Sequence, residues 1–153
     1  AIPLFTKDSL ADPARKALRQ NAGTLHVHPG GRFVYQANRS AIPDASGKPV
    51  GAGGENSIAV YAINQQTGEP TMMQSADTRG AEPRTFALDP SARILVAANQ
   101  TEMFTGSGTN AKMIPASLAV FRVRNDGTLD FVRTYDVDTS TGRMFWMGIV
   151  PLP

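Results

Sequence analysis

The sequence contains no cysteine, so disulfide bonds and thiolate metal sites are excluded. The formal net charge is only +2 at pH 7, and no run of basic residues interleaves with aromatics, which argues against a nucleic-acid-binding surface. No apolar run approaches the roughly 18–20 residues that a membrane-spanning helix needs. The first residues, 1–4, lack a basic stretch followed by an apolar one, so no signal peptide is expected.

Glycine and proline are frequent instead, with 14 and 11 copies in 153 residues. Together with short runs of β-branched residues, this composition predicts many short strands separated by turns. The chain is 41% apolar and 18% charged, so we expect a soluble, globular protein. The absence of cysteine fits either the cytoplasm or the periplasm and does not decide between them.

An internal repeat of about 60 residues is the most informative feature of the sequence. Segment 25–38 aligns with 86–99, and segment 57–63 aligns with 117–123. Each repeat reads as a strand, a proline turn, a strand ending in asparagine, a long loop, a strand, a glycine turn and a strand. This order predicts a four-stranded antiparallel meander in each copy.

The strands carry apolar residues on both faces, as in 57–63, where Ile58 and Val60 share one face and Tyr61 and Ile63 the other. A sheet that is buried on both sides needs a neighbour on both sides. Four-stranded units stacked face to face in a ring satisfy this need. The repeat therefore predicts consecutive blades of a β-propeller.

We predict an all-β fold, a propeller fragment of about two four-stranded antiparallel blades that another segment or chain completes. Asp8 or Ser9 is a candidate helix cap, and apolar residues four apart follow it, so one short helix is expected at about 9–20. The chain then divides into an N-terminal extension with this helix at 1–22, blades at 23–79 and 80–137, and a ring-closing strand with a tail at 138–153.

Four segments of the sequence, 28–39, 56–61, 82–90 and 98–100, resemble the lactonase-type seven-bladed propeller family, which includes bacterial phosphogluconolactonase and the fungal carboxymuconate lactonising enzyme. The resemblance extends over residues 23–150. It implies that the chain is the C-terminal part of a seven-bladed ring, and that a companion polypeptide supplies the remaining blades. It also implies an enzyme without metal or cofactor that opens or forms a small anionic or sugar-derived lactone.

Strand order predicts which polar residues meet, because the start of the first strand and the end of the second lie at the same end of a blade. In the family, arginines in the Asn-Arg and Pro-Arg motifs are thought to bind and polarise the substrate, and this resemblance assigns those roles to Arg39 and Arg84. Arg84 would polarise the lactone carbonyl and Arg39 would hold the anionic group. The predicted catalytic residues are Arg84, Arg39 and Glu82, and the predicted substrate-binding residues are Asn38, Asn99, Gln100 and Arg143.

The identity of the general base stays open at this point. Some relatives have an acidic residue where this chain has Gln100, which cannot take a proton. Glu82, Glu55 and Glu102 lie in loops on the same face and are candidates, and the missing segment is another source. His26 and His28 are interpreted as structural, because no third metal ligand lies near them in sequence.

A second function class is a non-catalytic propeller that binds a partner or ligand on the same face. The Asn-Arg and Pro-Arg motifs favour the enzyme, whereas Gln100 and the long loops at 41–54 and 101–116 favour the binding protein. The arginines also have a purely structural interpretation, in which they tie adjacent blades together through loop carbonyls. No nucleic acid or membrane partner is expected.

Overall fold

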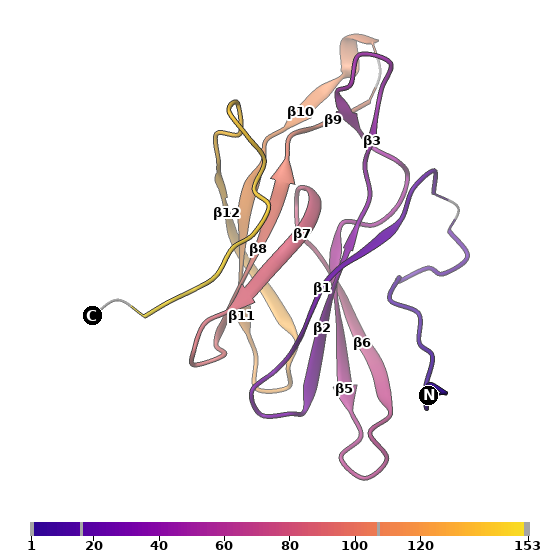
Figure 1. Ribbon diagram of the computed structural model, residues 1–153, viewed down its shortest axis with the longest axis vertical. Coiled ribbons are helices and arrows are strands. Elements are labelled where there is room, and N and C mark those ends of the chain that lie inside the picture. The colour runs from indigo at the N-terminus through magenta and orange to yellow at the C-terminus, as the bar shows by residue number, and fades with distance from the viewer. Residues whose placement is uncertain (1, 16, 107, 152–153) are drawn as a thin grey trace.

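The computed structural model describes residues 2–15, 17–106 and 108–151, and two four-stranded sheets dominate it (Figure 1). Blade one pairs, in this order, β1 (Asn21–Val27), β2 (Phe33–Arg39), β5 (Ser57–Ile63) and β6 (Pro70–Asp77). Blade two pairs β7 (Ala81–Leu88), β8 (Ile94–Thr101), β11 (Ser117–Val123) and β12 (Leu129–Asp136). All ladders of the two blades are antiparallel, which confirms the predicted meanders.

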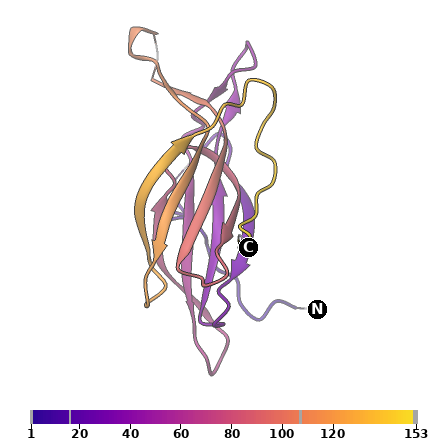
Figure 2. The same cartoon turned by 90° about the vertical axis from the view of Figure 1, so that its left-hand side faces the viewer.

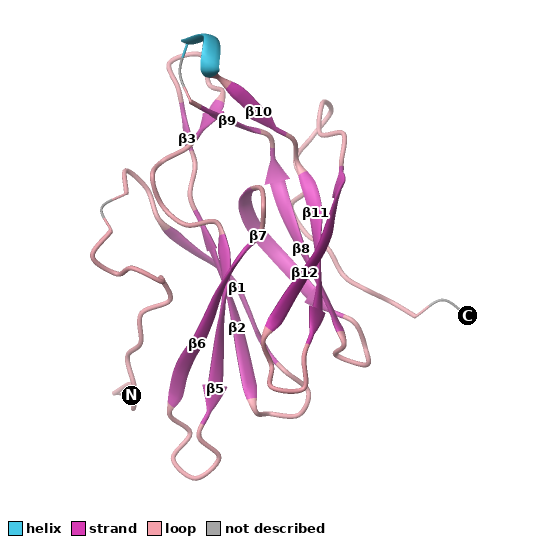
Figure 3. Cartoon of the chain, turned by 180° about the vertical axis from the view of Figure 1, so that it is seen from behind, coloured by secondary structure: helices cyan, strands magenta, loops and turns pink. Residues whose placement is uncertain are grey.

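A third, smaller sheet joins the two long loops, and the sequence did not predict it (Figure 3). We call it the loop sheet: it contains β3 (Ile42–Pro43), β4 (Pro49–Val50), β9 (Met103–Thr105) and β10 (Lys112–Ile114), with a 3-10 helix, η1 (Gly108–Asn110), before β10. The two loops meet where β4 runs parallel to β9, with Val50 opposite Phe104. The Gly51 N–H also donates to the Phe104 carbonyl at 3.3 Å. The loop sheet therefore binds both blades together at one end of the molecule.

The hydrophobic core lies between the two blades, whose sheets stack face to face (Figure 2). Phe33, Tyr35 and Val60 from blade one pack with Phe86 and Phe121 from blade two, and all five side chains are buried. Burying one such side chain contributes roughly 1.5–3 kcal/mol. The contact between the blades is therefore a main source of stability.

A buried hydrogen bond crosses this interface, from the Tyr35 hydroxyl to the Gly127 carbonyl, at 2.9 Å. Gly127 has a φ of +85°, and a Cβ at this position would lie 2.4 Å from the Phe33 ring. Only glycine fits both the positive φ of this turn in blade two and the close approach of Phe33 from blade one. The glycine turn that the repeat indicated is therefore also a packing contact between blades.

We expect Tyr35→Phe to lower the free energy of unfolding by about 1–3 kcal/mol, because the buried Gly127 carbonyl loses its donor. Burial and the nearby Asp126 carboxylate raise the pKa of Tyr35 from 10.0 to about 12. A raised pKa in the folded state favours folding of the protonated form. The contribution of Tyr35 is therefore complete below about pH 10 and is lost as the pH rises towards about 12.

Urea unfolding of wild type and Tyr35→Phe at about pH 7 and about pH 11 measures both effects. The variant should be less stable at the lower pH and should lose less stability than wild type on going to the higher one. Identical pH dependence in the two proteins would contradict a role for the Tyr35 phenol.

The outward faces of both blades carry exposed apolar side chains. Blade two exposes 44% of Ile94 and 50% of Val132, and blade one exposes 55% of Leu25 and 56% of Val27. Ile94 is followed on β8 by the buried core residue Leu95, and Leu25 and Val27 flank His26, which packs on Phe86 of blade two, so these three side chains point away from the contact between the blades. Each blade thus has an apolar face without a neighbouring blade among the described residues.

The predicted helix at about 9–20 is wrong, because the described residues of this stretch, 9–15 and 17–20, are irregular (Figure 1; Lys16 lies outside the described residues). Pro13 gives the physical reason: it has no N–H to donate, and its ring disfavours helical backbone at the preceding residue. The segment bonds to blade one instead, through Tyr61 hydroxyl to Asp8 carbonyl at 2.6 Å, Ala11 N–H to Glu55 Oε1 at 2.8 Å and Leu18 N–H to Ala52 carbonyl at 2.8 Å. No helix in the described part of the chain has the length and apolar character of a membrane span.

Residues 138–151 contain no strand and residues 152–153 lie outside the described residues, so the ring-closing strand predicted within 138–153 stays a prediction (Figure 2). A strand needs a partner for its backbone groups, and in this part of the chain none pairs with it. The segment is largely exposed, with 66% of Phe145, 71% of Trp146 and 75% of Val150 accessible. It crosses blade two near β7, where the Phe145 ring contacts Arg84.

Candidate active site

A cleft of about 490 Å³ opens at the end of the blades where the loop sheet lies. We call it the arginine cleft. Its charged and amide-bearing lining residues are Arg19, Arg39, Glu82, Arg84, Gln100 and Arg143. Ile42 and Pro43 of β3 form part of its apolar wall. The cleft brings together five of the seven residues that the sequence predicted as functional.

Glu82 lies on β7 with a backbone φ of +54°, in the left-handed region that non-glycine residues seldom adopt. The backbone is held there by a hydrogen bond from the Glu82 N–H to Asn56 Oδ1 at 2.9 Å, and the ladder to β8 shifts register between Pro83 and Thr85. Residues in such conformations cost of order 1–3 kcal/mol and cluster at functional sites. The sequence placed Glu82 in a loop; the structure makes it a buried residue of an irregular strand, only 4% exposed.

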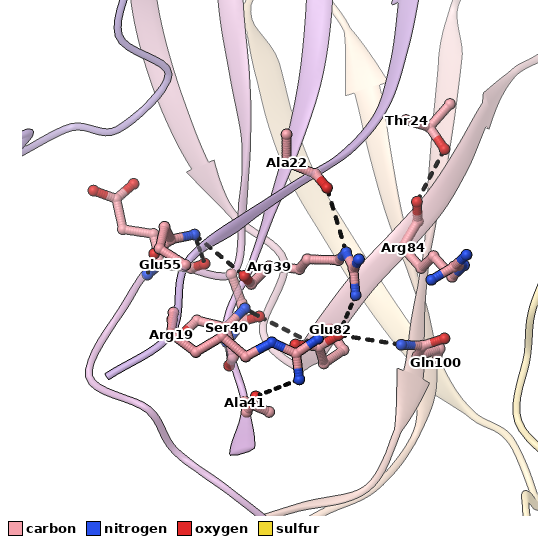
Figure 4. Close-up of polar contacts among 12 residues, drawn as sticks. Arg19, Ala22, Thr24, Arg39, Ser40, Ala41, Glu55, Glu82, Arg84 and Gln100 are labelled. Carbon is pink, nitrogen blue, oxygen red and sulfur yellow. Dashed lines mark hydrogen bonds and ion pairs between the residues drawn. The ribbon is translucent and has the colours of Figure 1, made fainter. Parts of the chain in front are cut away.

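Two side chains from different blades hold the Glu82 carboxylate (Figure 4). Arg39 Nη1, at the end of β2, donates to Glu82 Oε2 at 2.7 Å, and Gln100 Nε2, at the end of β8, donates to the same oxygen at 3.2 Å. The other oxygen, Oε1, is buried and has no hydrogen-bond partner in the described part of the chain. The carboxylate is thus fixed by one oxygen, while the second is buried and left without a hydrogen-bond donor.

The ion pair between Arg39 and Glu82 is mostly buried, with 16% and 6% of the two side chains exposed. Arg39 Nε also donates to the Ala22 carbonyl at 3.4 Å. Most of the Arg39 guanidinium is therefore engaged by the protein. Arg39 thus ties the two blades together, as the structural interpretation of the arginines holds. It is less free to hold a substrate anion than expected.

Arg84, the residue after Pro83, contributes a guanidinium without a hydrogen bond or ion pair among the described residues. Its planar group stacks over the Phe145 ring, with Cζ 4.1 Å from the ring centre. The Arg84 carbonyl accepts a hydrogen bond from Thr24 Oγ1 at 2.9 Å, which ties the backbone to blade one. The donors of Arg84 therefore remain available in the cleft on a fixed backbone.

Asn38 and Asn99 lie outside the lining of the cleft, and their predicted role in binding substrate stays a prediction. Asn99 Nδ2 donates to the Thr78 carbonyl at 2.9 Å and to Ser117 Oγ at 3.1 Å. Asn38 makes the matching contact in blade one, receiving a hydrogen bond from Ser9 Oγ at 2.7 Å and donating to Ser57 Oγ at 3.4 Å. Both asparagines fasten the second strand of a blade to the start of its third.

The other candidate bases lie elsewhere. Glu55 accepts hydrogen bonds with both oxygens, from Ala11 N–H and Asp12 N–H on Oε1 and from Ser57 Oγ and Ser75 Oγ on Oε2. It therefore anchors the N-terminal segment. Glu102 borders a separate hollow beside residues 137–140. Of the three glutamates, only Glu82 lines the arginine cleft.

The two histidines are also placed outside the cleft. His28 accepts a hydrogen bond from the Gly30 N–H at 3.0 Å, in the proline turn at the opposite end of blade one. His26 packs on Phe86, with ring centres 4.7 Å apart, and burial lowers its pKa. Among the described residues, no three His, Asp or Glu side chains gather in a way that could hold a metal ion.

Arg19 is the lining residue that sequence reasoning missed, because the expected helix gave its position no defined place. A signal was available. Arg19 lies two residues before β1, and the start of β1 pairs with the end of β2, where Asn21 lies opposite Arg39. The residues just before β1 therefore reach the same end of the blade as the predicted site.

Comparisons with known proteins identify relatives of the chain. The model of a family described as "Lactonase, 7-bladed beta-propeller" matches residues 5–103. A 6-phosphogluconolactonase of Bacillus subtilis (strain 168) is 40% identical over 76 residues, which is 50% of this chain and 18% of the relative. A 6-phosphogluconolactonase of Formosa agariphila is 31% identical over 87 residues, which is 57% of this chain and 21% of the relative.

Solved structures agree on the fold. The periplasmic gluconolactonase of Pseudomonas aeruginosa matches 84% of this chain with a TM-score of 0.60 and 25% identity. A Lactobacillus plantarum protein matches 80% of it with a TM-score of 0.57 and 24% identity. This chain spans about a fifth of the curated relatives and 28% of each of these two structures. With the family model matched over more than half of its residues, the chain belongs to the lactonase family of seven-bladed β-propellers.

Proposed function

We propose that the intact protein, meaning this chain together with the blades that complete its ring, hydrolyses a small sugar-derived lactone in the arginine cleft. The observation that carries the proposal is the buried Glu82 carboxylate, fixed through Oε2 and without a hydrogen-bond partner at Oε1, in the same cleft as the unpaired Arg84 guanidinium. A carboxylate beside a free guanidinium supplies the two functions that ester hydrolysis needs, a base for water and a cation for the developing oxyanion.

The reaction begins when Glu82 Oε1 accepts a proton from a water molecule and the resulting hydroxide adds to the lactone carbonyl carbon. Negative charge develops on the carbonyl oxygen, and two N–H groups of Arg84 stabilise it. The tetrahedral intermediate then collapses with cleavage of the ring C–O bond. The protonated Glu82 returns the proton to the departing alkoxide, which yields the open hydroxy acid.

Arg39 and Gln100 act as positioning residues in this mechanism. Both donate to Glu82 Oε2, so they fix the orientation of the carboxylate and leave Oε1 as its unpaired oxygen. Gln100, which cannot itself take a proton, thereby serves the base instead of replacing it. The proposed role of Arg39 moves accordingly from the substrate anion to the carboxylate. The mechanism uses side chains alone and calls on no metal or cofactor.

The comparisons support a sugar lactone as substrate. Two curated relatives are named 6-phosphogluconolactonase, and a structural neighbour is described as a periplasmic gluconolactonase. The cleft, at about 490 Å³, has the size of a small-molecule site.

A companion segment of roughly 180–220 residues supplies the remaining blades in this proposal, either on the same polypeptide or on a second one. The open apolar faces of both blades and the small share of the relatives that this chain spans support this proposal. A seven-bladed ring, which the family description names, gives each outer face a neighbour.

We expect Arg84→Ala to lower kcat for a lactone by about 10²–10³-fold, the scale for removing one donor to an oxyanion. Arg84→Lys should restore activity only in part, because a single ammonium replaces a planar group with two parallel donors. Titrating glucono-δ-lactone hydrolysis against base consumption measures the rates. Arg93→Ala, which removes an exposed arginine at the opposite end of blade two, is the matched control and should leave kcat unchanged.

Melting temperatures of the same variants separate catalysis from folding. The Arg84 side chain stacks on an exposed phenylalanine and should contribute little to stability. If Arg84→Ala instead melts much earlier and its activity follows the folded fraction, Arg84 is a tie between segments. If wild type opens no lactone in a panel of neutral and anionic ones, the protein is a binding propeller, and ligand binding at the same cleft becomes the property to measure.

A further inference from the structure

Arg19 belongs to a segment that is irregular but firmly attached beside the cleft. Ser40 Oγ donates to the Arg19 carbonyl at 2.6 Å, and the preceding Leu18 N–H donates to the Ala52 carbonyl at 2.8 Å. The following Gln20 exchanges two hydrogen bonds with the backbone of Glu55, at 2.7 and 3.1 Å. Bonds on both sides of Arg19 fix its backbone against the loop that follows β2.

The Arg19 side chain is directed into the arginine cleft from this anchor (Figure 4). Nη1 donates to the Ala41 carbonyl, at the foot of the loop sheet, at 3.2 Å. Among the described residues, Nε and Nη2 of Arg19 have no hydrogen-bond acceptor, and no carboxylate pairs with the guanidinium. One donor thus orients the group while the others face the cleft and solvent.

The charges of the cleft do not balance. Four arginines and one glutamate line it, and Glu82 neutralises only Arg39. Arg84, Arg19 and Arg143 remain, on three different segments of the chain. A concave site whose walls carry charge of one sign attracts an ion of the opposite sign. Because the proposed reaction uses Arg84 at the carbonyl, two cations are left for another part of the substrate.

We propose that Arg19 is a specificity-determining residue that binds an anionic group of the lactone, a phosphate or a carboxylate, away from the ring that is opened. The assignment rests on the proposed function for the lactone itself. Arginine suits this role because its planar group donates two parallel hydrogen bonds to such an oxyanion. Arg143, which is exposed at the same cleft, is the second cation of this subsite.

The test compares Arg19→Gln with wild type on glucono-δ-lactone, on its 6-phosphate and on glucarolactone, which carries a carboxylate. Arg19→Gln should raise KM for the anionic lactones by about tenfold, the scale of one charge-assisted hydrogen bond at a partly solvated site, and leave kcat nearly unchanged. KM for the neutral lactone should stay the same. A larger effect on the phosphate than on the carboxylate identifies phosphate as the group bound, and the reverse identifies carboxylate. Arg15→Gln, a change of an exposed arginine in the same segment that does not line the cleft, should alter none of these values.

Arg19→Lys provides a second variant, which should recover part of the affinity and weaken it more steeply with salt. Calorimetric binding of 6-phosphogluconate, which needs no turnover, reads out the subsite independently of catalysis. If lactones are hydrolysed but Arg19→Gln changes the neutral and anionic substrates alike, the role of Arg19 is overturned and the proposed function stands. If no lactone is hydrolysed but 6-phosphogluconate binding depends on Arg19, the subsite stands and the hydrolase is overturned.

Discussion

Replacing Glu82 by glutamine is expected to lower kcat for lactone hydrolysis by about 10²–10⁴-fold, the range that a positioned general base contributes. Glutamine preserves the size of the side chain and can still accept a hydrogen bond from Arg39. It cannot take a proton from water, so the step that generates hydroxide loses its base. The rate of the variant should also rise with hydroxide concentration over a wider pH range than the rate of wild type.

Loss of stability is the alternative explanation for such a result, because removing one partner of a buried ion pair costs about 3–5 kcal/mol. Arg39→Gln breaks the same 2.7 Å pair and leaves the carboxylate in place. It should melt about as early as Glu82→Gln while retaining much more activity per folded molecule. Equal losses of activity in the two variants would mean that the pair only supports the fold.

Glu55→Gln is the matched control for the base itself, since the sequence also makes Glu55 a candidate general base. Its two oxygens accept hydrogen bonds from the N-terminal segment and from serines of blade one, outside the cleft. The change should therefore affect melting more than kcat. A large loss of kcat in Glu55→Gln with normal kcat in Glu82→Gln would move the base to the other glutamate.

The two blades could be predicted because their signal is long and repeated. Two segments of seven or more residues recur at a spacing of about 60, each with a turn at a fixed place. The loop sheet left no such signal. Its strands have two or three residues, and its two halves meet at the single pair of Val50 and Phe104. Such short pairing between two loops depends on the positions in which the blades hold them. A local sequence pattern does not encode these positions.

The site followed from strand order more than from residue type. Arg39, Arg84 and Gln100 meet because strand ends of adjacent blades meet, and this order was readable. The ion pair between Arg39 and Glu82 could not be predicted, since nothing in the sequence marks Glu82 as a residue with a φ of +54°. Asn38, which resembles a site residue by position, lies outside the cleft lining and contacts Ser9 and Ser57, so its predicted role in binding substrate stays a prediction. Motif position therefore located the cleft but did not assign the roles within it.

Residues 1–153 produced alone are expected to aggregate and to melt without a cooperative transition, whereas co-production with the companion blades should give a monodisperse, cooperatively melting protein. The reason is the pair of open sheet faces, on which Ile94, Val132, Leu25 and Val27 are each about half exposed. Contiguous apolar surface of this kind drives association unless a partner covers it. Size-exclusion chromatography and calorimetry on the two preparations make the comparison. A monodisperse monomer of the isolated chain with one sharp transition would contradict the need for further blades.

Charge placed on one face separates association through that face from general insolubility. Ile94→Lys puts an ammonium on the open face of blade two, so it should raise the solubility of the isolated chain and, at the same time, impair assembly with the companion blades. Met113→Lys is the matched control, because Met113 on β10 is 52% exposed but lies on the loop sheet and not on a blade face. It should leave assembly intact. Opposite effects of Ile94→Lys on the isolated chain and on the assembled ring follow only if the same apolar face drives aggregation in the first case and ring closure in the second.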